Sequence, residues 1–268
     1  MGVGQSPLIV LDGVSKDYMS TLNGAVVNAL KSVTFTVASG EFFVILGPSG
    51  SGKTTILNLI AGFEQATSGL LTVRGQPISR PSWERVVVFQ EHGLFPWLTA
   101  AANIEFGLKM KGIPSAARKN IVAEYIKIVG LQGFEDKYPK ELSGGMKQRV
   151  GIARALAVDS EIVIMDEPLG SLDAQTRTEM QDELLRILQH ERKKTVVLVT
   201  HSIEEALKLG DTIVVMSARP GRVRETFRIT QPRPRKVLID PEMIKLNVKL
   251  HELLFLESAK EAVYGERP

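Results

Sequence analysis

One eight-residue segment constrains the fold of this chain more than any other. It reads Gly47-Pro48-Ser49-Gly50-Ser51-Gly52-Lys53-Thr54. The segment fits the pattern G-x-x-x-x-G-K-[ST], a loop whose backbone N–H groups cradle phosphate oxygens. The apolar run Phe42–Leu46 precedes it and Thr54–Ala61 carries helical spacing, which is the strand–loop–helix context that the pattern requires. We therefore expect an α/β fold with a phosphate-binding loop (the P-loop) at residues 47–54.

The residue types in the P-loop suit a nucleotide and Mg²⁺. Its glycines let backbone N–H groups approach phosphate oxygens without side-chain clashes, and the start of the following helix adds partial positive charge. Lys53 can reach the β- and γ-phosphates, and the Thr54 hydroxyl can bind Mg²⁺. We expect nucleotide contacts from every residue of the loop and from Thr55. A surface turn rich in glycine and serine is the alternative.

The composition is that of a soluble globular protein, with 44% hydrophobic and 24% charged residues among 268. No apolar run reaches the roughly 18 residues that span a bilayer, and Met1 to Pro7 lack the regions of a signal peptide, so we expect a cytoplasmic location. The chain has no cysteine, which excludes disulfides, thiolate metal sites and cysteine catalysis. Its 33 basic and 30 acidic residues nearly balance, so no nucleic-acid partner is expected.

Short apolar runs alternate with helical segments along most of the chain. Strands are expected at Leu8–Leu11, Phe42–Leu46, Arg85–Phe89, Ile162–Met165, Val196–Val199 and Ile213–Val215. Helices are expected at Thr54–Ala61, Ala174–His190 and Ile203–Leu209. Several strands are apolar throughout, which is typical of strands buried on both faces. The order predicts a mostly parallel sheet with helices on both faces.

The stretch from about residue 91 to residue 158 differs, because it has few β-branched runs and reads as consecutive helices. These are Ala101–Met110, Ser115–Val129 and Gly145–Val158. We interpret this stretch as a helical subdomain inserted into an α/β core formed by residues 1–90 and 159–230.

Residues 231–268 form a separate C-terminal segment in this division. The Pro/Arg stretch Gln231–Arg235 interrupts regular structure. Beyond it, Pro241–Val263 has apolar residues at helical spacing, with Asp240 as a cap, and is expected to be a packed helix. Residues 244, 246, 248 and 250 also alternate, which leaves a short strand as the alternative.

Two carboxylates, Asp166 and Glu167, directly follow the apolar run Ile162–Met165. A carboxylate at the end of a buried strand beside a P-loop can hold the Mg²⁺ shell. Its neighbour can orient or deprotonate an attacking water. We therefore expect Asp166 to be a metal residue and Glu167 to be catalytic. Two ordinary acidic residues opening a loop before Pro168 are the alternative.

A second potential anion site begins at Ser143. The run Ser143-Gly144-Gly145 precedes an expected helix, Met146–Val158. A serine cap followed by glycines leaves exposed N–H donors at the start of a helix, and these suit an anion. One chain does not need two γ-phosphate sites, so on the residues alone a simple serine-capped helix is an equal alternative.

Three segments in this order resemble the ATP-hydrolysing subunits of ABC transporters: the P-loop, Leu142-Ser143-Gly144-Gly145-Met146-Lys147-Gln148-Arg149, and Ile162–Glu167. The middle segment resembles the signature motif of that family. There, two subunits meet head to tail, and each signature motif clamps the γ-phosphate held by the partner's P-loop. The resemblance implies ATP with Mg²⁺, a homodimer, and ATP contacts in trans from Ser143, Gly144 and Gly145.

Four further positions match the same family. Gln90 stands at the Q-loop position, which implies contact with Mg²⁺ or the lytic water, and Ser171-Leu172-Asp173 resembles the D-loop of the dimer interface. His201 matches the switch histidine that hydrogen-bonds the γ-phosphate, and Tyr18 stands where an aromatic ring stacks on adenine. The alternatives are a surface glutamine, a structural histidine at a strand end and a packed tyrosine. The expected catalytic set is Glu167, His201, Gln90 and Lys53, and the metal set is Thr54, Gln90 and Asp166.

The resemblance spans roughly Leu8 to Arg228. It implies a P-loop NTPase core with a mostly parallel sheet, an N-terminal antiparallel β part and the inserted helical subdomain. Two departures are mild, since Leu169 and Ser171 stand where close relatives often carry Phe and Ala. Neither threatens catalysis.

A narrower resemblance is to the nitrate/sulfonate/taurine group of bacterial importers. It rests on Phe89–Thr99, Ser143–Leu156 and Ser217–Val223. It implies an ATPase on the cytoplasmic face of the inner membrane that powers uptake of a small anion or related solute. The implied partners are integral membrane permease subunits and a periplasmic or lipoprotein solute-binding protein.

Two other functions are open on the sequence. A soluble ABC ATPase outside transport is disfavoured by the single P-loop and the absence of long heptads and cysteines. A different P-loop enzyme, such as a small-molecule kinase, is disfavoured by Leu142–Arg149, because a kinase needs no second phosphate-clamping motif.

Phe95 and Trp97 follow Gln90 in an expected loop. Exposed aromatic side chains usually mark contact surfaces. We expect these two to help line the groove that receives a cytoplasmic helix of the permease. Local core beneath the helical insertion is the alternative.

Overall fold

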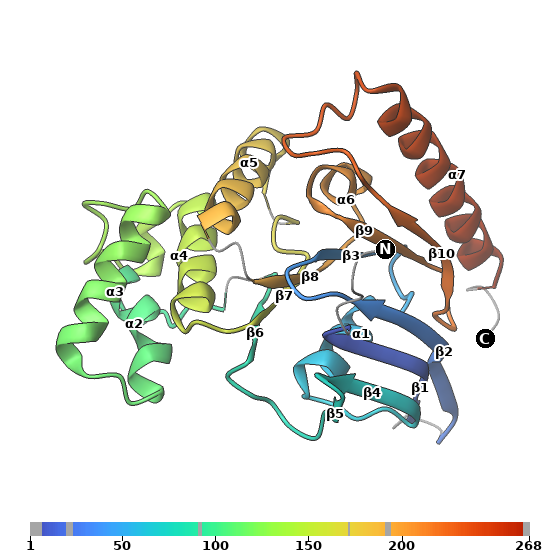
Figure 1. Cartoon of the computed structure of the whole chain (residues 1–268), viewed down its shortest axis with the longest axis horizontal. Coiled ribbons are helices and arrows are strands. Elements are labelled where there is room, and N and C mark those ends of the chain that lie inside the picture. Colours follow the sequence, from blue (N-terminus) through green and yellow to red (C-terminus); the bar gives the residue numbers. More distant parts are fainter. Residues whose placement is uncertain (1–6, 20–23, 91–92, 171, 191–193, 265–268) are drawn as a thin grey trace, which may run out of the picture. The chain divides into compact units, whose positions relative to one another are not determined.

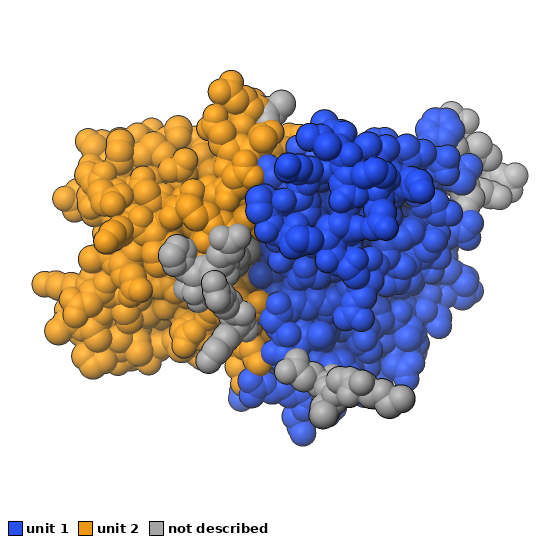
Figure 2. All heavy atoms as spheres, turned by 45° about the horizontal axis from the view of Figure 1, so that its top comes forward, with its two compact units in different colours: residues 1–81, 195–268 blue, residues 82–194 orange. Residues whose placement is uncertain are grey.

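The structure is a computed structural model that describes residues 7–19, 24–90, 93–170, 172–190 and 194–264 (Figure 1). Internal contacts divide the chain into unit 1, residues 1–81 with 195–268, and unit 2, residues 82–194 (Figure 2). This partition is not the division at residues 91 and 158 expected from the sequence. The expected subdomain boundaries therefore stay a prediction.

Unit 1 contains a four-stranded antiparallel sheet with the strand order β2-β1-β4-β5 (Figure 1). Its strands are β1 (Ile9–Met19), β2 (Val26–Val37), β4 (Ser68–Val73) and β5 (Gln76–Pro77). Along the end of β2, Val33, Phe35 and Val37 are buried and the residues between them are exposed, so one face of this strand lies in the core. This sheet confirms the expected N-terminal antiparallel part.

Unit 1 also contains three parallel strands and one antiparallel strand, in the order β10-β9-β3-β8. They are β3 (Phe42–Leu46), β8 (Thr195–Thr200), β9 (Thr212–Met216) and β10 (Val223–Arg228). Every residue of β3, β8 and β9 is buried, which explains why these strands are apolar apart from threonines at the ends of β8 and the start of β9. The ring of Phe43 in β3 stacks on Phe35 of β2 with centroids 4.9 Å apart, so the core is continuous from one strand to the other.

Three helices of unit 1 pack against these strands. They are α1 (Lys53–Ala61), α6 (Ile203–Leu209) and α7 (Pro241–Tyr264). Helix α1 packs on β8, α6 packs on β3 and β8, and α7 contacts α6 and β9. The C-terminal segment is thus a long helix packed on unit 1, as the helical spacing indicated, and the alternative of a short strand is wrong.

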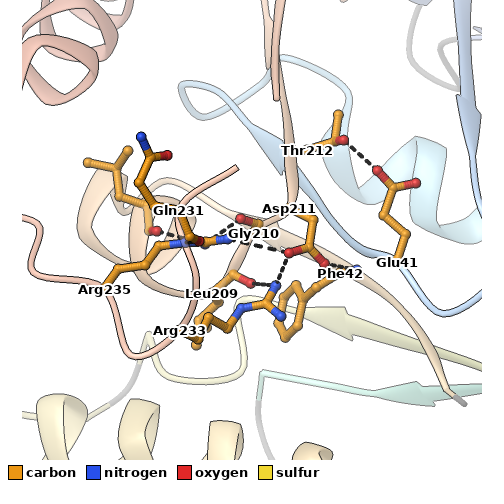
Figure 3. A network of polar contacts seen from close by, with 10 residues as sticks. Glu41, Phe42, Leu209, Gly210, Asp211, Thr212, Gln231, Arg233 and Arg235 are labelled. Carbon is orange, nitrogen blue, oxygen red and sulfur yellow. Dashed lines mark hydrogen bonds and ion pairs between the residues drawn. The ribbon is translucent and has the colours of Figure 1, made fainter. Parts of the chain in front are cut away.

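Within unit 1, two arginines hold the Pro/Arg stretch before α7 against the end of α6 and the residues that follow it (Figure 3). Arg233 donates to the Asp211 carboxylate across 2.6 Å, and Arg235 donates to the carbonyl of Leu207 across 3.0 Å. Asp211 also accepts from the backbone N–H of Phe42, the first residue of β3, across 3.0 Å. Burial, together with the nearby charge of Arg233, lowers the pKa of Arg235 to about 10. Through these hydrogen bonds, the Pro/Arg stretch is held at the end of α6, and Asp211 connects it to the start of β3.

In its described residues, unit 2 combines two parallel strands with four α-helices. The strands are β6 (Arg85–Val88) and β7 (Ile162–Asp166). The helices are α2 (Ala100–Met110), α3 (Ser115–Ile128), α4 (Gly144–Ala157) and α5 (Ala174–His190), with a 3-10 turn at Pro139–Glu141. Helices α2, α3 and α4 pack on one another, and a Cβ at Gly107 of α2 would lie 2.3 Å from Val158, so the helices approach closely there.

The α/β fold expected from the sequence is therefore confirmed, with parallel strands flanked by helices and a separate antiparallel sheet. The expected helices begin and end within two residues of the observed ones. Strands β2, β4, β5 and β10 were not expected individually, and β1 is longer than Leu8–Leu11. In the described part of the chain, no helix has both the length and the apolar character needed to cross a membrane.

Candidate nucleotide-binding site

The P-loop connects β3 to α1 in unit 1. Gly50 and Gly52 have φ angles of 71° and 83°, a left-handed conformation that L side chains rarely adopt. A Cβ at Gly52 would lie 2.5 Å from a side-chain carbon of Leu30, so this position also lacks room for a side chain. The glycines thus let the backbone turn sharply at the start of the helix, where N–H groups without helical partners suit an anion.

Lys53 lies inside the curve of this loop. Its side-chain amine is buried and donates to the carbonyls of Gly47 and Pro48, both across 2.8 Å. The Ser51 hydroxyl donates to the same Pro48 carbonyl across 2.8 Å. Thr54, the next residue of α1, is exposed. The loop therefore places a positive charge and an exposed hydroxyl-bearing residue next to each other at the start of a helix.

A hollow of about 200 Å³ adjoins the P-loop, and we call it the P-loop hollow. Its walls combine an aromatic ring, small apolar residues of β2, the loop backbone and two cationic side chains, Lys53 and Arg219. The lining residues are Tyr18, Val27, Ala29, Gly50, Gly52, Lys53, Thr54, Thr55 and Arg219. Tyr18 and the P-loop, which were predicted from separate parts of the sequence, therefore line one hollow.

Tyr18 is fixed in the wall of this hollow by hydrogen bonds. Its hydroxyl donates to Glu64 across 2.7 Å, and the Lys16 amine lies 5.0 Å from the centre of its ring. Glu64 also accepts from Asn58 across 3.1 Å and pairs with Lys16 at 3.2 Å. Burial is the main cause that raises the pKa of Tyr18 above its usual value. The ring is held in place and remains partly exposed, as a stacking platform requires.

His201 follows β8 in unit 1 and is exposed. The residues on either side of it are hydrogen-bonded to each other, because the Ser202 N–H donates to the Thr200 hydroxyl across 3.0 Å. Ser202 in turn caps α6 by accepting from the Glu205 N–H across 3.3 Å. The turn that presents His201 is thus held on both sides.

Asp166 and Glu167 lie in unit 2, at the end of β7. Asp166 is the last residue of the strand, and both side chains are half-buried. Glu167 has a φ of 43°, which is uncommon for a residue other than glycine and costs free energy. Its carbonyl accepts from the Gly170 N–H across 3.0 Å, so a tight turn follows the two carboxylates.

Gln90 lies beside this turn within unit 2. It follows β6, which is parallel to β7, and it is exposed. A Cβ at Gly170 would lie 3.2 Å from the Gln90 side-chain nitrogen and 3.3 Å from the Glu167 carbonyl. The structure therefore brings Gln90 close to the turn that begins at Glu167.

The segment at Ser143 forms the start of α4 in unit 2. The Ser143 hydroxyl accepts from the Met146 N–H across 3.3 Å, and Gly144 and Gly145 are the first two residues of the helix. Ser143 and Gly144 are exposed. The serine cap that the sequence predicted is present. The exposed start of α4 is compatible with an anion-binding site and equally with a simple serine-capped helix.

Asp173 caps α5 in the same unit. It accepts from the Thr176 N–H across 3.0 Å, and this backbone hydrogen bond is the main cause that lowers the pKa of Asp173. Asp173 is exposed, so it is available for contact with another molecule. Ser171, the first residue of the expected D-loop, lies outside the described residues.

Comparison with known proteins decides the family. The family model described as ABC transporter matches residues 30–170, which is more than half of the chain. The chain belongs to the ABC transporter family. It is therefore an ABC ATPase, and the P-loop of unit 1 is the nucleotide-binding loop of that family.

Individual relatives of this ABC ATPase are similar over most of their length. A taurine import ATP-binding protein of Pelagibacter ubique is 49% identical over 78% of both chains. An uncharacterised ABC transporter ATP-binding protein of Methanocaldococcus jannaschii is 53% identical over 80% of this chain and 79% of its own. The solved dimeric cassette MJ0796 is 34% identical with a TM-score of 0.72, over 84% of this chain and all of that one.

Three residues of the P-loop hollow were not predicted from the sequence. Val27 and Ala29 belong to β2, a strand that was not expected. Arg219 belongs to Ser217–Val223, which was noted only as part of a family resemblance. Arg219 lies beside the P-loop because the turn between β9 and β10 packs there, and no local pattern in the sequence indicates this position.

Proposed function

We propose that this ABC ATPase powers the uptake of a small anion or related solute, of the taurine, sulfonate or nitrate kind, through a separate membrane permease. The P-loop hollow in an ABC family member supports the ATPase activity. The importer role is supported by similarity to taurine import ATP-binding proteins of Pelagibacter ubique and Chromobacterium violaceum, which are 49% and 46% identical. The chain would act on the cytoplasmic face of the membrane with a solute-binding protein outside.

Two copies of the chain form the working ATPase in this proposal. Each copy would hold ATP in its P-loop and contact the other copy's ATP through Ser143, Gly144, Gly145 and Asp173. The support is the exposure of Ser143, Gly144 and Asp173, together with the similarity to a cassette solved as a dimer. A helix start with exposed N–H groups suits the negative charge of a γ-phosphate held by a partner.

Hydrolysis would depend on charge stabilisation and on an oriented water. Lys53 and the loop N–H groups would hold the phosphates, and exchange of the Lys53 hydrogen bonds from carbonyls to phosphate oxygens would keep its charge paired. Glu167 would orient the attacking water or accept its proton, and His201 would hydrogen-bond the γ-phosphate. Tyr18 would stack on adenine.

The residues proposed for Mg²⁺ offer the ligands that this cation prefers. Thr54 supplies a hydroxyl, Gln90 an amide oxygen and Asp166 a carboxylate, and hard oxygen donors of this kind suit Mg²⁺. Thr54 and Gln90 are exposed and Asp166 is half-buried. The cation, when bound, neutralises charge on the phosphates.

The permease would dock on the aromatic residues that follow Gln90. Trp97 has 70% of its surface exposed. Phe95 is half-buried and its ring lies 4.5 Å from that of Phe106, with the Arg154 guanidinium 5.6 Å away. The ring of Phe95 packs on Phe106 and lies 5.6 Å from that of Trp97. The exposed surface of Trp97 supports a contact with the permease.

Reconstitution tests the importer role. The chain is combined with its cognate permease and solute-binding protein in proteoliposomes, and ATP turnover is measured with taurine, an alkanesulfonate or nitrate. We expect turnover to rise when one of these solutes and the binding protein are both present. If the rate of ATP turnover were the same with and without the permease and each solute, the result would instead support a soluble ABC ATPase outside transport.

A further inference from the structure

The turn Ser217–Arg222, between β9 and β10, reaches the P-loop hollow. Arg219 is one of the residues that line the hollow, and it is exposed. Two backbone hydrogen bonds of 2.9 Å attach the turn to β2, one from the Gly221 N–H to the Ala29 carbonyl and one from the Lys31 N–H to the Gly221 carbonyl. Since Ala29 also lines the hollow, the turn and β2 form adjoining parts of one wall.

The same turn packs directly on the P-loop. A Cβ at Gly221 would lie 2.1 Å from the Ser51 carbonyl oxygen, closer than any side chain can approach. Gly221 is buried, and it is the residue of the Ser217–Arg222 turn that contacts the P-loop at Ser51. This contact holds the backbone of the turn that carries Arg219 against the P-loop.

Internal hydrogen bonds close the turn. The Ser217 N–H donates to the Arg222 carbonyl across 2.9 Å, and the Ser217 hydroxyl accepts from the Arg222 N–H across 3.1 Å. The same hydroxyl donates to the Pro220 carbonyl across 3.2 Å. Arg219 is therefore presented by a closed turn rather than by an open loop.

Helix α7 supports the turn through a buried carboxylate. Glu257 of α7 is 2% exposed and accepts from the Ala218 N–H across 3.1 Å. Its other oxygen lies 3.6 Å from the Arg224 guanidinium. Burying a carboxylate is costly unless it is hydrogen-bonded and paired, so Glu257 ties the end of α7 to the residue next to Arg219.

We propose that Arg219 binds the nucleoside part of the nucleotide, and that Glu257 is a positioning residue that holds the turn of Arg219 in place. The phosphate end of the hollow already has the loop backbone and Lys53, whereas Tyr18, Val27 and Ala29 form the aromatic and apolar side that suits a base. A guanidinium can stack on a base and donate to base or ribose oxygens at the same time. The proposal rests on the proposed function, because it takes the P-loop hollow as the nucleotide site.

Calorimetric titration of the full chain with ADP and with pyrophosphate tests the Arg219 contact. Neither ligand needs to be hydrolysed, and they differ by the nucleoside. Arg219→Ala should weaken ADP binding roughly tenfold, the equivalent of one guanidinium contact, and leave pyrophosphate binding unchanged. Arg228→Ala, which removes an exposed arginine of β10 outside the hollow, is the matched control and should bind both ligands normally. Unchanged ADP binding by Arg219→Ala, or equal weakening of both ligands, would overturn the proposal.

The same titration tests Glu257. Glu257→Ala should weaken ADP binding in the otherwise unaltered chain but cause no further loss in an Arg219→Ala background, because it acts through Arg219. Glu257→Gln, which keeps an acceptor for the Ala218 N–H, should restore most of the affinity. Additive losses, or a loss of pyrophosphate affinity, would show general damage to unit 1 and reject the positioning role.

A third variant distinguishes a failure of the Arg219 contact from a failure of the nucleotide-site assignment. Lys53→Met should weaken pyrophosphate binding if the P-loop hollow is the phosphate site. If it does not, the assignment of the hollow fails. If it does and Arg219→Ala binds ADP normally, only the contact with Arg219 fails.

Discussion

The side-chain hydroxyl of Thr200 donates a hydrogen bond to the carboxylate of Glu205 across 2.6 Å. Both residues are buried, with 2% and 3% of their surfaces exposed. Thr200 is the last residue of β8 and Glu205 lies in the first turns of α6, so the bond spans the turn that contains His201. A buried polar contact of this kind fixes the backbone on both sides of the proposed phosphate-sensing histidine.

Replacing Thr200 by valine should therefore lower both stability and turnover. Valine keeps the shape of threonine but leaves the Ser202 N–H and the Glu205 carboxylate without this hydroxyl, a loss of about 1–3 kcal/mol in the free energy of unfolding. Urea unfolding and steady-state ATP turnover measure the two effects. Thr200→Ser keeps the hydroxyl and should retain most of both. Equal stability of the valine and serine variants would show that the hydrogen bond contributes nothing.

The hydrogen bonds on Glu64 should make the stability of unit 1 sensitive to acid. Burial alone would raise the pKa of Glu64, but hydrogen bonds from Tyr18, Lys16 and Asn58 outweigh it and leave the pKa below its ordinary value of 4.5. A depressed pKa stabilises the fold above the unfolded-state value and loses that contribution as pH falls through the folded value. Unfolding measured across this range should show that the advantage of the unaltered chain over Glu64→Gln is constant well above pH 4.5 and shrinks below it.

Tyr18→Phe provides the matched control for Glu64. It removes one hydrogen bond to the carboxylate and keeps the ring, so the pKa of Glu64 should rise and the loss of stability on acidification should become smaller. The ring can still stack on a base, so ADP affinity should change little. An acid profile identical to that of the unaltered chain would show that Tyr18 does not depress the pKa.

Lys53→Met should weaken ATP binding by about 10- to 100-fold, the range expected for hydrogen bonds from a charged group to phosphate. Methionine fills a similar volume but cannot donate, so the loop loses its charge with little change in packing. Equilibrium titration with ATP measures the effect. Lys245→Met removes an exposed lysine of α7 and serves as the control for charge. Normal ATP affinity in the Lys53 variant would contradict the assignment of the loop.

Trp97→Ala should reduce capture of the chain by its cognate permease in detergent without changing its thermal stability. The side chain is 70% exposed, so its removal costs little internal packing but removes a large contact surface. Trp83→Ala is the matched control, since Trp83 is 50% exposed and also belongs to unit 2. Equal capture of both variants would place the permease contact elsewhere.

Elements with strong local signals were predictable from the sequence. Phe42–Leu46 is apolar throughout, and it is a strand buried along its whole length. Helix α5 begins and ends where its spacing indicated. In both cases the local hydrophobic pattern agrees with the tertiary environment, so the pattern alone is sufficient.

Other parts of the fold depend on contacts between distant residues. The alternation of Val33, Phe35 and Val37 with polar residues could have predicted the end of β2. Its first half, residues 26–31, does not alternate, and its place beside β1 depends on the register of the sheet. The Pro/Arg stretch was predicted as an interruption, yet Arg233 and Arg235 bind Asp211 more than twenty residues away. Long-range hydrogen bonds of this kind leave no periodic signal.

In the candidate site, too, some residues were predictable from local sequence and others were not. The P-loop was predictable because its chemistry requires a fixed local spacing. The positions of Tyr18 and Arg219 in the P-loop hollow depend on how β1, β2 and the β9–β10 turn meet, which no spacing encodes. The role of Glu167 stays a prediction from its place after a buried strand in a chain with a P-loop, and the roles of Gln90 and His201 stay predictions that rest on family resemblance.

In the proposed ATPase, two copies of this chain complete each ATP site. Glu167→Gln should block hydrolysis while ATP is still bound, and this variant should sediment as a monomer without nucleotide and as a dimer with ATP and Mg²⁺. Adding Ser143→Arg, which fills the exposed start of α4 with a bulky side chain, should return it to a monomer. Sedimentation of Glu167→Gln with ATP is the direct measurement. A dimer that holds two ATP supports a site shared between two copies, and a monomer saturated with ATP contradicts it.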